Sequence, residues 1–101
     1  MLRPDECTGL ADIRHAIDTL DHEMVTLLGK RMGYVLAASR FKPNEQSIPA
    51  PDRVASMLEA RRRWAKENGL DSDFVESLFE HLIPWFIARQ VEYWRSRRGQ
   101  A

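Results

Sequence analysis

The chain opens with a long stretch in which apolar residues return at every third or fourth position, which is the period of an amphipathic α-helix. The series runs through Leu10, Ile13, Ile17, Leu20, Met24 and Leu27 and continues to Val35 and Ala38. Thr8 precedes the series and is a residue type that caps helices, and the next proline along the chain is Pro43. This pattern predicts a first helix over about residues 9–41.

The rest of the chain is expected to form a loop and two further helices. Residues 42–51 contain three prolines and predict the loop. A second helix is predicted over about 52–68, because Asn68-Gly69 is a common signal for a helix end. The polar residues 71–73 can cap a third helix over about 72–97, in which Pro84 is expected to cause a kink. Together these elements predict one all-α domain covering residues 1–101.

The length of the first helix indicates a second copy of the chain. About 32 residues at a rise of ~1.5 Å span ~48 Å, whereas a compact domain of this size has a radius of gyration near ~13 Å. The apolar stripe therefore needs cover from another chain, and we expect an intertwined homodimer with two-fold symmetry. The alternative is a break at Gly29 and Gly33 that folds the helix back into a monomeric bundle.

Composition and charge narrow the function classes. The chain has 101 residues, of which 44% are hydrophobic and 30% charged, as in a globular protein. Fifteen Lys and Arg balance fifteen Asp and Glu, which argues against binding to nucleic acid or to anionic membrane. No apolar run approaches the ~18 residues of a membrane span, and residues 1–6 lack a signal-peptide core. With one cysteine, Cys7, and no zinc spacing, we expect a reduced, cytoplasmic protein.

Cations occupy positions where the apolar stripe should continue. The step after Leu27 falls on Arg31, the later one falls on Lys42, and Arg14 flanks the stripe near its other end. A guanidinium on an apolar face is costly unless an anion meets it. A crossed partner helix can bring Arg14 to the other two cations, which predicts a pocket for a small anion with more than one carboxylate. The alternative is that each cation reaches solvent or pairs with an acidic neighbour on its own helix.

The third helix adds a neutral polar group to this hypothesis. Gln90 follows Phe86 by four residues and lies at the edge of an apolar face, where its amide can both donate and accept. The alternative is an interhelical hydrogen bond with no functional role. His15 and His22 lack a third ligand at metal-binding spacing, so we interpret them as exposed polar residues. The sequence offers no phosphate-binding loop or activated nucleophile, and we expect neither a cofactor nor a metal.

The segment from Leu10 to Asp21, followed by Arg31 and Lys42, resembles the first helix of the all-helical chorismate mutases. It matches their Leu-x-x-x-Arg-x-x-Ile-Asp-x-Leu-Asp signature in order. The helix order and Gln90 extend the resemblance over nearly the whole chain. It implies an intertwined homodimer with two active sites, in which Arg31, Lys42 and Gln90 of one chain and Arg14 of the partner contact the substrate.

The departures from the mutase pattern point to a branch of that fold. Mutases place acidic residues in the loop and at the start of the second helix, where this chain has Ala50 and Val54. The chain instead resembles the branch that splits isochorismate into salicylate and pyruvate in siderophore synthesis. Segments that carry this resemblance are 7–14, 39–42, 48–51 and 67–70.

Membership of that branch implies a lyase that works without a cofactor. The reaction is expected to be a pericyclic elimination with hydrogen transfer inside one molecule, and weak chorismate mutase activity is expected beside it. Two alternatives stay open: a chorismate mutase that makes prephenate from chorismate, and a non-enzymatic helical dimerisation module.

Overall fold

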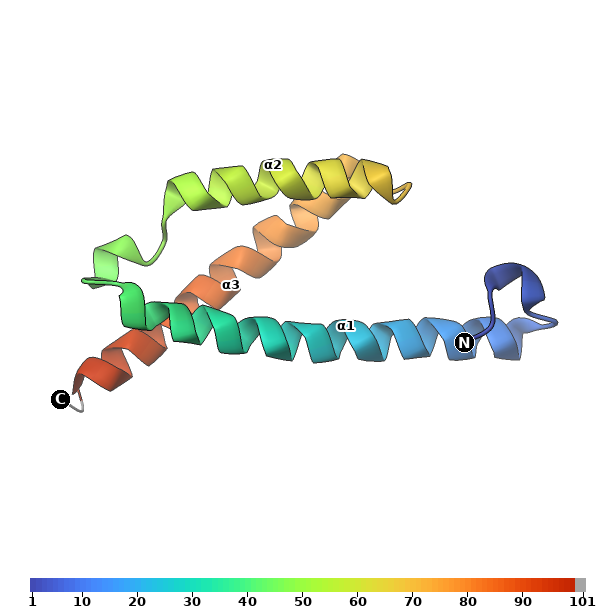
Figure 1. The fold of residues 1–101 in the computed structure, drawn as a ribbon, viewed down its shortest axis with the longest axis horizontal. Helices are drawn as coiled ribbons and strands as arrows, with labels where there is room; N and C mark the ends of the chain where they lie inside the picture. Colours follow the sequence, from blue (N-terminus) through green and yellow to red (C-terminus); the bar gives the residue numbers. More distant parts are fainter. Residues whose placement is uncertain (100–101) are drawn as a thin grey trace. The chain divides into compact units, whose positions relative to one another are not determined.

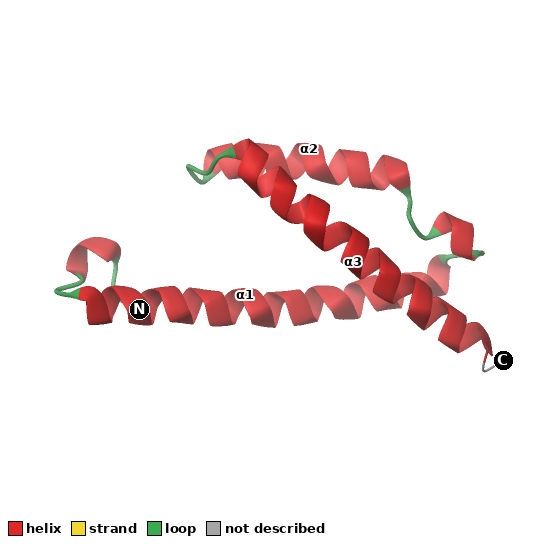
Figure 2. Cartoon of the chain, turned by 180° about the vertical axis from the view of Figure 1, so that it is seen from behind, coloured by secondary structure: helices red, strands yellow, loops and turns green. Residues whose placement is uncertain are grey.

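The computed structural model describes residues 1–99, and within them the regular structure is entirely helical (Figures 1 and 2). The elements are η1 (Pro4–Glu6), α1 (Leu10–Ala38), η2 (Ser39–Phe41), η3 (Glu45–Ser47), α2 (Pro51–Glu67) and α3 (Ser72–Gly99). The predicted all-α fold with three main helices is confirmed. The chain divides into two compact units, Met1–Gly33 and Tyr34–Ala101.

The start of α1 is built differently from the prediction. The carbonyl of Gly9, rather than that of Thr8, accepts the first helical hydrogen bond, from the Ile13 N–H at 3.3 Å. Thr8 instead donates its N–H and its hydroxyl to the carboxylate of Asp12, each at 3.0 Å. These two hydrogen bonds lower the pKa of Asp12. The prediction of Thr8 as the cap is therefore wrong: α1 begins at Leu10, so Gly9 is the cap residue and Thr8 precedes it.

The α1 helix continues through both of its glycines. Gly29 and Gly33 lie inside a single helix that ends at Ala38, so the alternative of a break at these residues is wrong. A tighter 3₁₀ turn, η2, follows directly and replaces the last three residues of the predicted helix. The apolar stripe is open to solvent in the single chain: Leu10 is 65% exposed and Leu27 is 60% exposed. Such a face ordinarily packs against another surface.

The unit Tyr34–Ala101 contains a hairpin of α2 and α3. Pro51 occupies the first turn of α2, where its missing N–H costs nothing. At the other end Gly69 has φ +71°, and the Leu70 N–H donates to the Ala65 carbonyl at 2.8 Å, which closes the helix in a Schellman motif. Asp71 then caps α3 as predicted, by accepting the Phe74 N–H at 2.8 Å.

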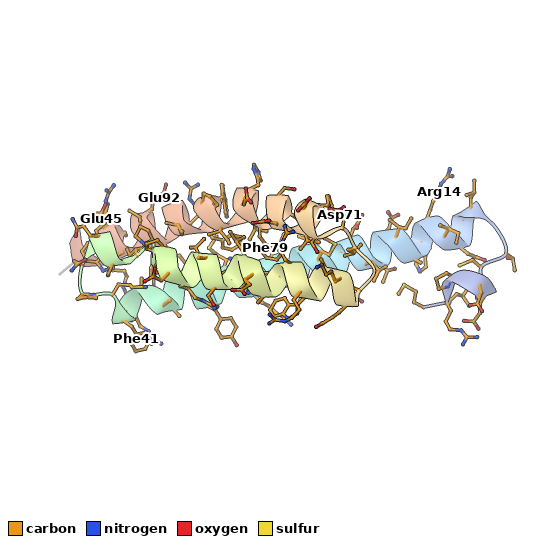
Figure 3. The ribbon with its side chains drawn as sticks, turned by 90° about the horizontal axis from the view of Figure 1, so that it is seen from above. Arg14, Phe41, Glu45, Asp71, Phe79 and Glu92 are labelled. Atoms are coloured by element: carbon orange, nitrogen blue, oxygen red, sulfur yellow. The ribbon has the colours of Figure 1, made fainter. Side chains whose placement is uncertain are left out.

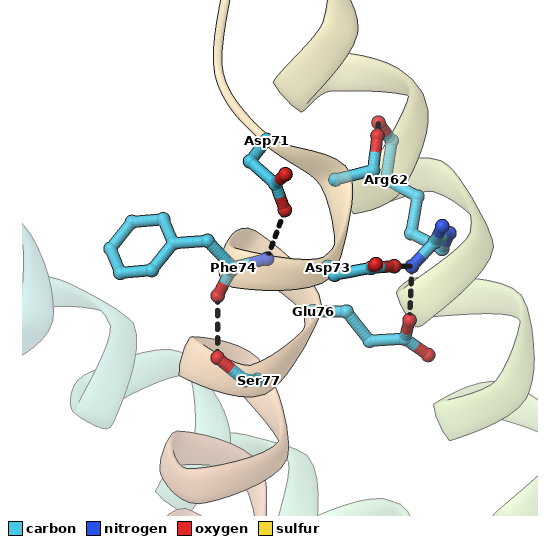
Figure 4. Close-up of polar contacts among 7 residues, drawn as sticks. Arg62, Asp71, Asp73, Phe74, Glu76 and Ser77 are labelled. Atoms are coloured by element: carbon cyan, nitrogen blue, oxygen red, sulfur yellow. Dashed lines mark hydrogen bonds and ion pairs between the residues drawn. The ribbon is translucent and has the colours of Figure 1, made fainter.

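Polar contacts between the two helices reinforce this turn (Figure 4). Arg62 of α2 donates to Asp73 at 2.8 Å and also to Glu76, and both bonds raise the pKa of its guanidinium. The Ser72 hydroxyl donates to the Arg62 carbonyl at 3.1 Å. Apolar residues that this unit buries are Ile48, Met57, Ala65, Ile83 and Phe86.

Pro84 lies inside α3, and the helix continues beyond it to Gly99. The ring removes one backbone donor from the helix, as any proline does. The kink expected there stays a prediction. Gln90 lies beyond Pro84, in the same continuous helix as the residues that follow it.

Candidate functional site

Arg14 and Arg31, the two predicted site arginines, lie on the same continuous helix. They are 17 positions apart in the sequence, which corresponds to about 25 Å at the helical rise of ~1.5 Å. Arg14 is exposed and its side chain points away from α1 (Figure 3). Arg31 is partly buried, and its Nη1 atom is shielded from solvent. One chain therefore cannot bring its own two arginines to one small ligand.

Lys42 follows η2 directly, at the start of a segment that we call the lysine loop (residues 42–48). Its N–H donates to the Ser39 carbonyl at 3.2 Å, which closes the 3₁₀ turn. Its Nζ donates to the Ser47 carbonyl at 3.3 Å, and the side chain is partly buried. An ammonium has three hydrogens, so two remain for an anionic ligand.

The lysine loop is attached to α3 close to Gln90. The indole Nε1–H of Trp94 donates to the carbonyl of Lys42 at 3.2 Å. Gln90 is 6% exposed and precedes Trp94 by four residues, so both lie on one face of the helix, one turn apart. Two of the four predicted site residues, Lys42 and Gln90, thus belong to the same part of this unit. Arg14 and Arg31 lie in the unit Met1–Gly33.

A second attachment lies three residues further along the loop. Arg95 donates to Glu45 through Nε, at 3.0 Å, and also through Nη2. The guanidinium lowers the pKa of the Glu45 carboxyl, and the carboxylate raises the pKa of Arg95. Sequence reasoning missed Trp94, Glu45 and Arg95. Only the spacing of four residues from Gln90 to Trp94 could have indicated that Trp94 faces the site.

The two positions at which the resemblance leads us to expect acids in a mutase hold no charge here. Ala50 adopts a left-handed backbone conformation, with φ 43°, immediately before α2, and Val54 is partly buried in its first turn. The predicted site therefore combines cationic and amide donors without a nearby acid from these two positions. Such a set can bind carboxylates and stabilise negative charge that develops on an oxygen.

Neither a side-chain cluster of the kind that binds metals nor a helix of the kind that crosses membranes occurs among residues 1–99. No cluster of three or more His, Cys, Asp and Glu side chains there could hold a metal ion. His15 and His22 are both exposed. None of the described helices has the length and apolar character that crossing a bilayer requires.

The chain is similar in sequence to a known family and to several known proteins. The profile of the family described as chorismate mutase type II matches residues 13–91. A Pseudomonas aeruginosa protein named isochorismate pyruvate lyase is 61% identical over 101 residues, which cover 100% of each chain. The T-protein of Haemophilus influenzae is 34% identical over 84% of this chain and 23% of its own. The chorismate mutase of Methanocaldococcus jannaschii is 29% identical over 83% of this chain and 86% of its own.

Proposed function

Because the chain belongs to the chorismate mutase type II family, we propose that it is an isochorismate pyruvate lyase, which converts isochorismate to salicylate and pyruvate. The observation that carries this proposal is the 61% identity, over the full length of both chains, to the Pseudomonas aeruginosa protein of that name. The uncharged Ala50 and Val54 support it, because they occupy the positions at which we expect acids in a mutase. The salicylate that this activity produces would be consumed in siderophore synthesis.

The proposed active site draws on two chains. Arg31, Lys42 and Gln90 of one protomer bind the substrate together with Arg14 of its partner. The separation of about 25 Å between Arg14 and Arg31 along α1 supports this division. The exposed apolar stripe of α1 supports a homodimer in which the long helices cover one another. We place this dimer in the cytoplasm, where the free thiol of Cys7 stays reduced.

The reaction proposed for this site needs positioning and electrostatics rather than a nucleophile. The ether C–O bond of isochorismate breaks, one ring hydrogen moves to the methylene carbon of the enolpyruvyl group, and pyruvate leaves as the ring becomes aromatic. Arg14 and Arg31 hold the two carboxylates in the reactive conformation. Alignment of this kind supplies part of the ~7–11 kcal/mol available to well-oriented intramolecular reactions.

Lys42 and Gln90 act on the bond that breaks. Negative charge grows on the ether oxygen as the C–O bond lengthens, and a preorganised donor there is worth roughly 2.7–4 kcal/mol. The ammonium of Lys42 is the stronger donor because it is charged. Gln90, largely buried, adds a neutral hydrogen bond to the same oxygen or to a carboxylate.

Salicylate fluorescence after isochorismate is added to the purified protein tests the proposal directly. We expect salicylate and pyruvate in equal amounts, and a much slower formation of prephenate from chorismate. Faster turnover of chorismate than of isochorismate would instead identify a chorismate mutase. A protein that turns over neither compound, and binds neither salicylate nor pyruvate by calorimetry, would be a non-enzymatic dimerisation module.

A further inference from the structure

We infer that Trp94 and the Glu45–Arg95 pair are positioning residues for Lys42, because they hold the lysine loop on α3 and so fix the place of the ammonium. This inference rests on the proposed function, in which Lys42 acts on the substrate. Neither Trp94 nor the ion pair is expected to touch the substrate. They act on the reaction indirectly, because they fix the backbone of residues 42–48 and so the position of Lys42.

Trp94 attaches the lysine loop to α3 at Lys42. An indole N–H can only donate, and this one meets the Lys42 carbonyl at 3.2 Å in a partly buried setting. The acceptor belongs to the same residue as the proposed catalytic ammonium. Any displacement of this carbonyl from α3 therefore also moves the Cα atom of Lys42, and with it the side chain, relative to Gln90. Gln90 lies one turn earlier on the helix.

A neighbouring ion pair attaches the lysine loop to α3 at a second point. Trp94 and Arg95 are adjacent in α3, and they reach the loop at Lys42 and at Glu45 respectively. Two attachments three residues apart prevent the loop from sliding and from rotating about a single bond. The Arg95 and Glu45 side chains are 64% and 33% exposed, so solvent screens this pair. We therefore expect Trp94 to have the larger effect.

Hydrogen bonds within the lysine loop also tie its residues to one another. The side chain of Asn44 accepts the Ser47 N–H at 3.0 Å and caps η3. Lys42 reaches the Ser47 carbonyl through Nζ, and Ile48 is only 3% exposed. The loop thus moves as one body that includes the ammonium. Its attachment to α3 then determines where the charge lies, and displacements near 1 Å can cost about a hundredfold in rate.

The Trp94→Phe variant tests this inference, since it removes the indole N–H and keeps an aromatic ring. We expect kcat to fall about tenfold, with KM changed less than about twofold, because the charge is displaced mainly from its transition-state position. Hydrogen exchange measured by mass spectrometry should become faster at residues 42–48 and stay unchanged in α2. Tyr93→Phe is the matched control: it removes a hydroxyl from the adjacent aromatic residue and should change neither measurement.

Reversal of the charges of Glu45 and Arg95 provides the second test. It also tests the attachment of the lysine loop if Trp94→Phe does not fold. Glu45→Arg alone should lower kcat severalfold and speed exchange in the lysine loop. The double variant Glu45→Arg with Arg95→Glu restores an attractive pair and should recover most of both. Arg97→Glu is the control, because it changes the charge of α3 by the same amount as Arg95→Glu, and it should have little effect on kcat or on loop exchange.

The results separate this inference from the proposed function. If the unmodified protein makes no salicylate, the proposed function fails, and exchange at residues 42–48 still judges the attachment of the loop. Normal kcat or unchanged loop exchange in Trp94→Phe overturns the positioning role. Faster exchange throughout the chain, with a lower melting temperature, also overturns it, because Trp94 would then serve general stability.

Discussion

At the scale of single residues, Lys42 combines a positive charge with a constrained backbone. One of its hydrogens binds the Ser47 carbonyl, and its own carbonyl is held by Trp94. The sequence predicted Lys42 and Gln90 as site residues because a charge or an amide interrupts the apolar period of a helix face. It did not predict Trp94 or Glu45, because their roles depend on contacts between segments about 50 residues apart, which no local pattern encodes.

Replacement of Lys42 by alanine should lower kcat by about a hundredfold or more, since one preorganised donor at a developing oxyanion contributes that much. The protein should stay folded, because the variant loses the hydrogen bond from Nζ to Ser47. Steady-state kinetics on isochorismate and circular dichroism check the two halves of this prediction. Lys66→Ala, at an exposed lysine in the last turn of α2, is the control and should turn over normally. Near-normal kcat in Lys42→Ala would reject the catalytic role.

Glu45 makes the attachment of the lysine loop sensitive to acid. Its pKa is lowered from an ordinary value of 4.5, first by the hydrogen bonds from Arg95. The Glu45–Arg95 attachment is therefore complete above the ordinary value and is lost as the pH falls through the lowered one, whereas the Trp94 hydrogen bond does not titrate. Exchange at residues 42–48, corrected for intrinsic rates, should stay slow from pH 7 to about 5 and rise only in stronger acid.

Glu45→Gln is the control for this acid response. The variant should exchange faster in the lysine loop already at neutral pH and show little further response to acid, because the titrating group is gone. An acid transition in the loop that survives Glu45→Gln would show that a different group controls it.

At the scale of elements, the predicted helices follow the structure closely because their caps are local. The α2 helix spans Pro51–Glu67 and α3 begins at Ser72, each within one residue of the prediction. The 3₁₀ turns η1, η2 and η3 were missed because three residues are too few to show a hydrophobic period. The error at Thr8 is of one position: the adjacent Gly9 is the cap residue, and the residue before it is tied to the first turn by its hydrogen bonds to Asp12.

The two ends of α2 permit a matched stability experiment. Ala50 and Gly69 both have positive φ, at 43° and 71°, a region that strains a residue with a Cβ atom. Ala50→Gly should therefore stabilise the protein by about 0.5–1 kcal/mol, and Gly69→Ala should destabilise it by about 1 kcal/mol. A Cβ added at Gly69 meets nothing within 4 Å, so the cost there is conformational rather than steric.

Urea unfolding of the two variants and of the unmodified protein measures these changes, with the same protomer concentration in each because assembly affects the midpoint. Ala→Gly substitution at an ordinary helical position, such as Ala60 inside α2, is the control and should destabilise. Destabilisation by Ala50→Gly of similar size would show that the backbone at residue 50 is not strained.

At the scale of the whole molecule, a single chain leaves both its apolar stripe and its proposed active site incomplete. Leu10, Met24 and Leu27 are each more than half exposed, and Arg14 lies too far along α1 to join Arg31 of the same chain. A second α1 that packs on the first would both cover the apolar stripe and supply the missing arginine. Sedimentation at micromolar concentration should therefore give the mass of two chains, and the mass of one chain would contradict the dimer.

Shared sites also predict complementation between two inactive chains. Arg14→Ala and Arg31→Ala homodimers should each be nearly inactive, because every site lacks one arginine. A heterodimer of the two, isolated with different affinity tags, has one site with both arginines and one with neither, and should regain about half of the unmodified activity. Arg31→Ala paired with Lys42→Ala is the matched control: both residues serve the same protomer's site, so each site keeps one defect and the heterodimer stays inactive. Recovery in the control pair, or none in the test pair, would mean that Arg14 does not complete the partner's site.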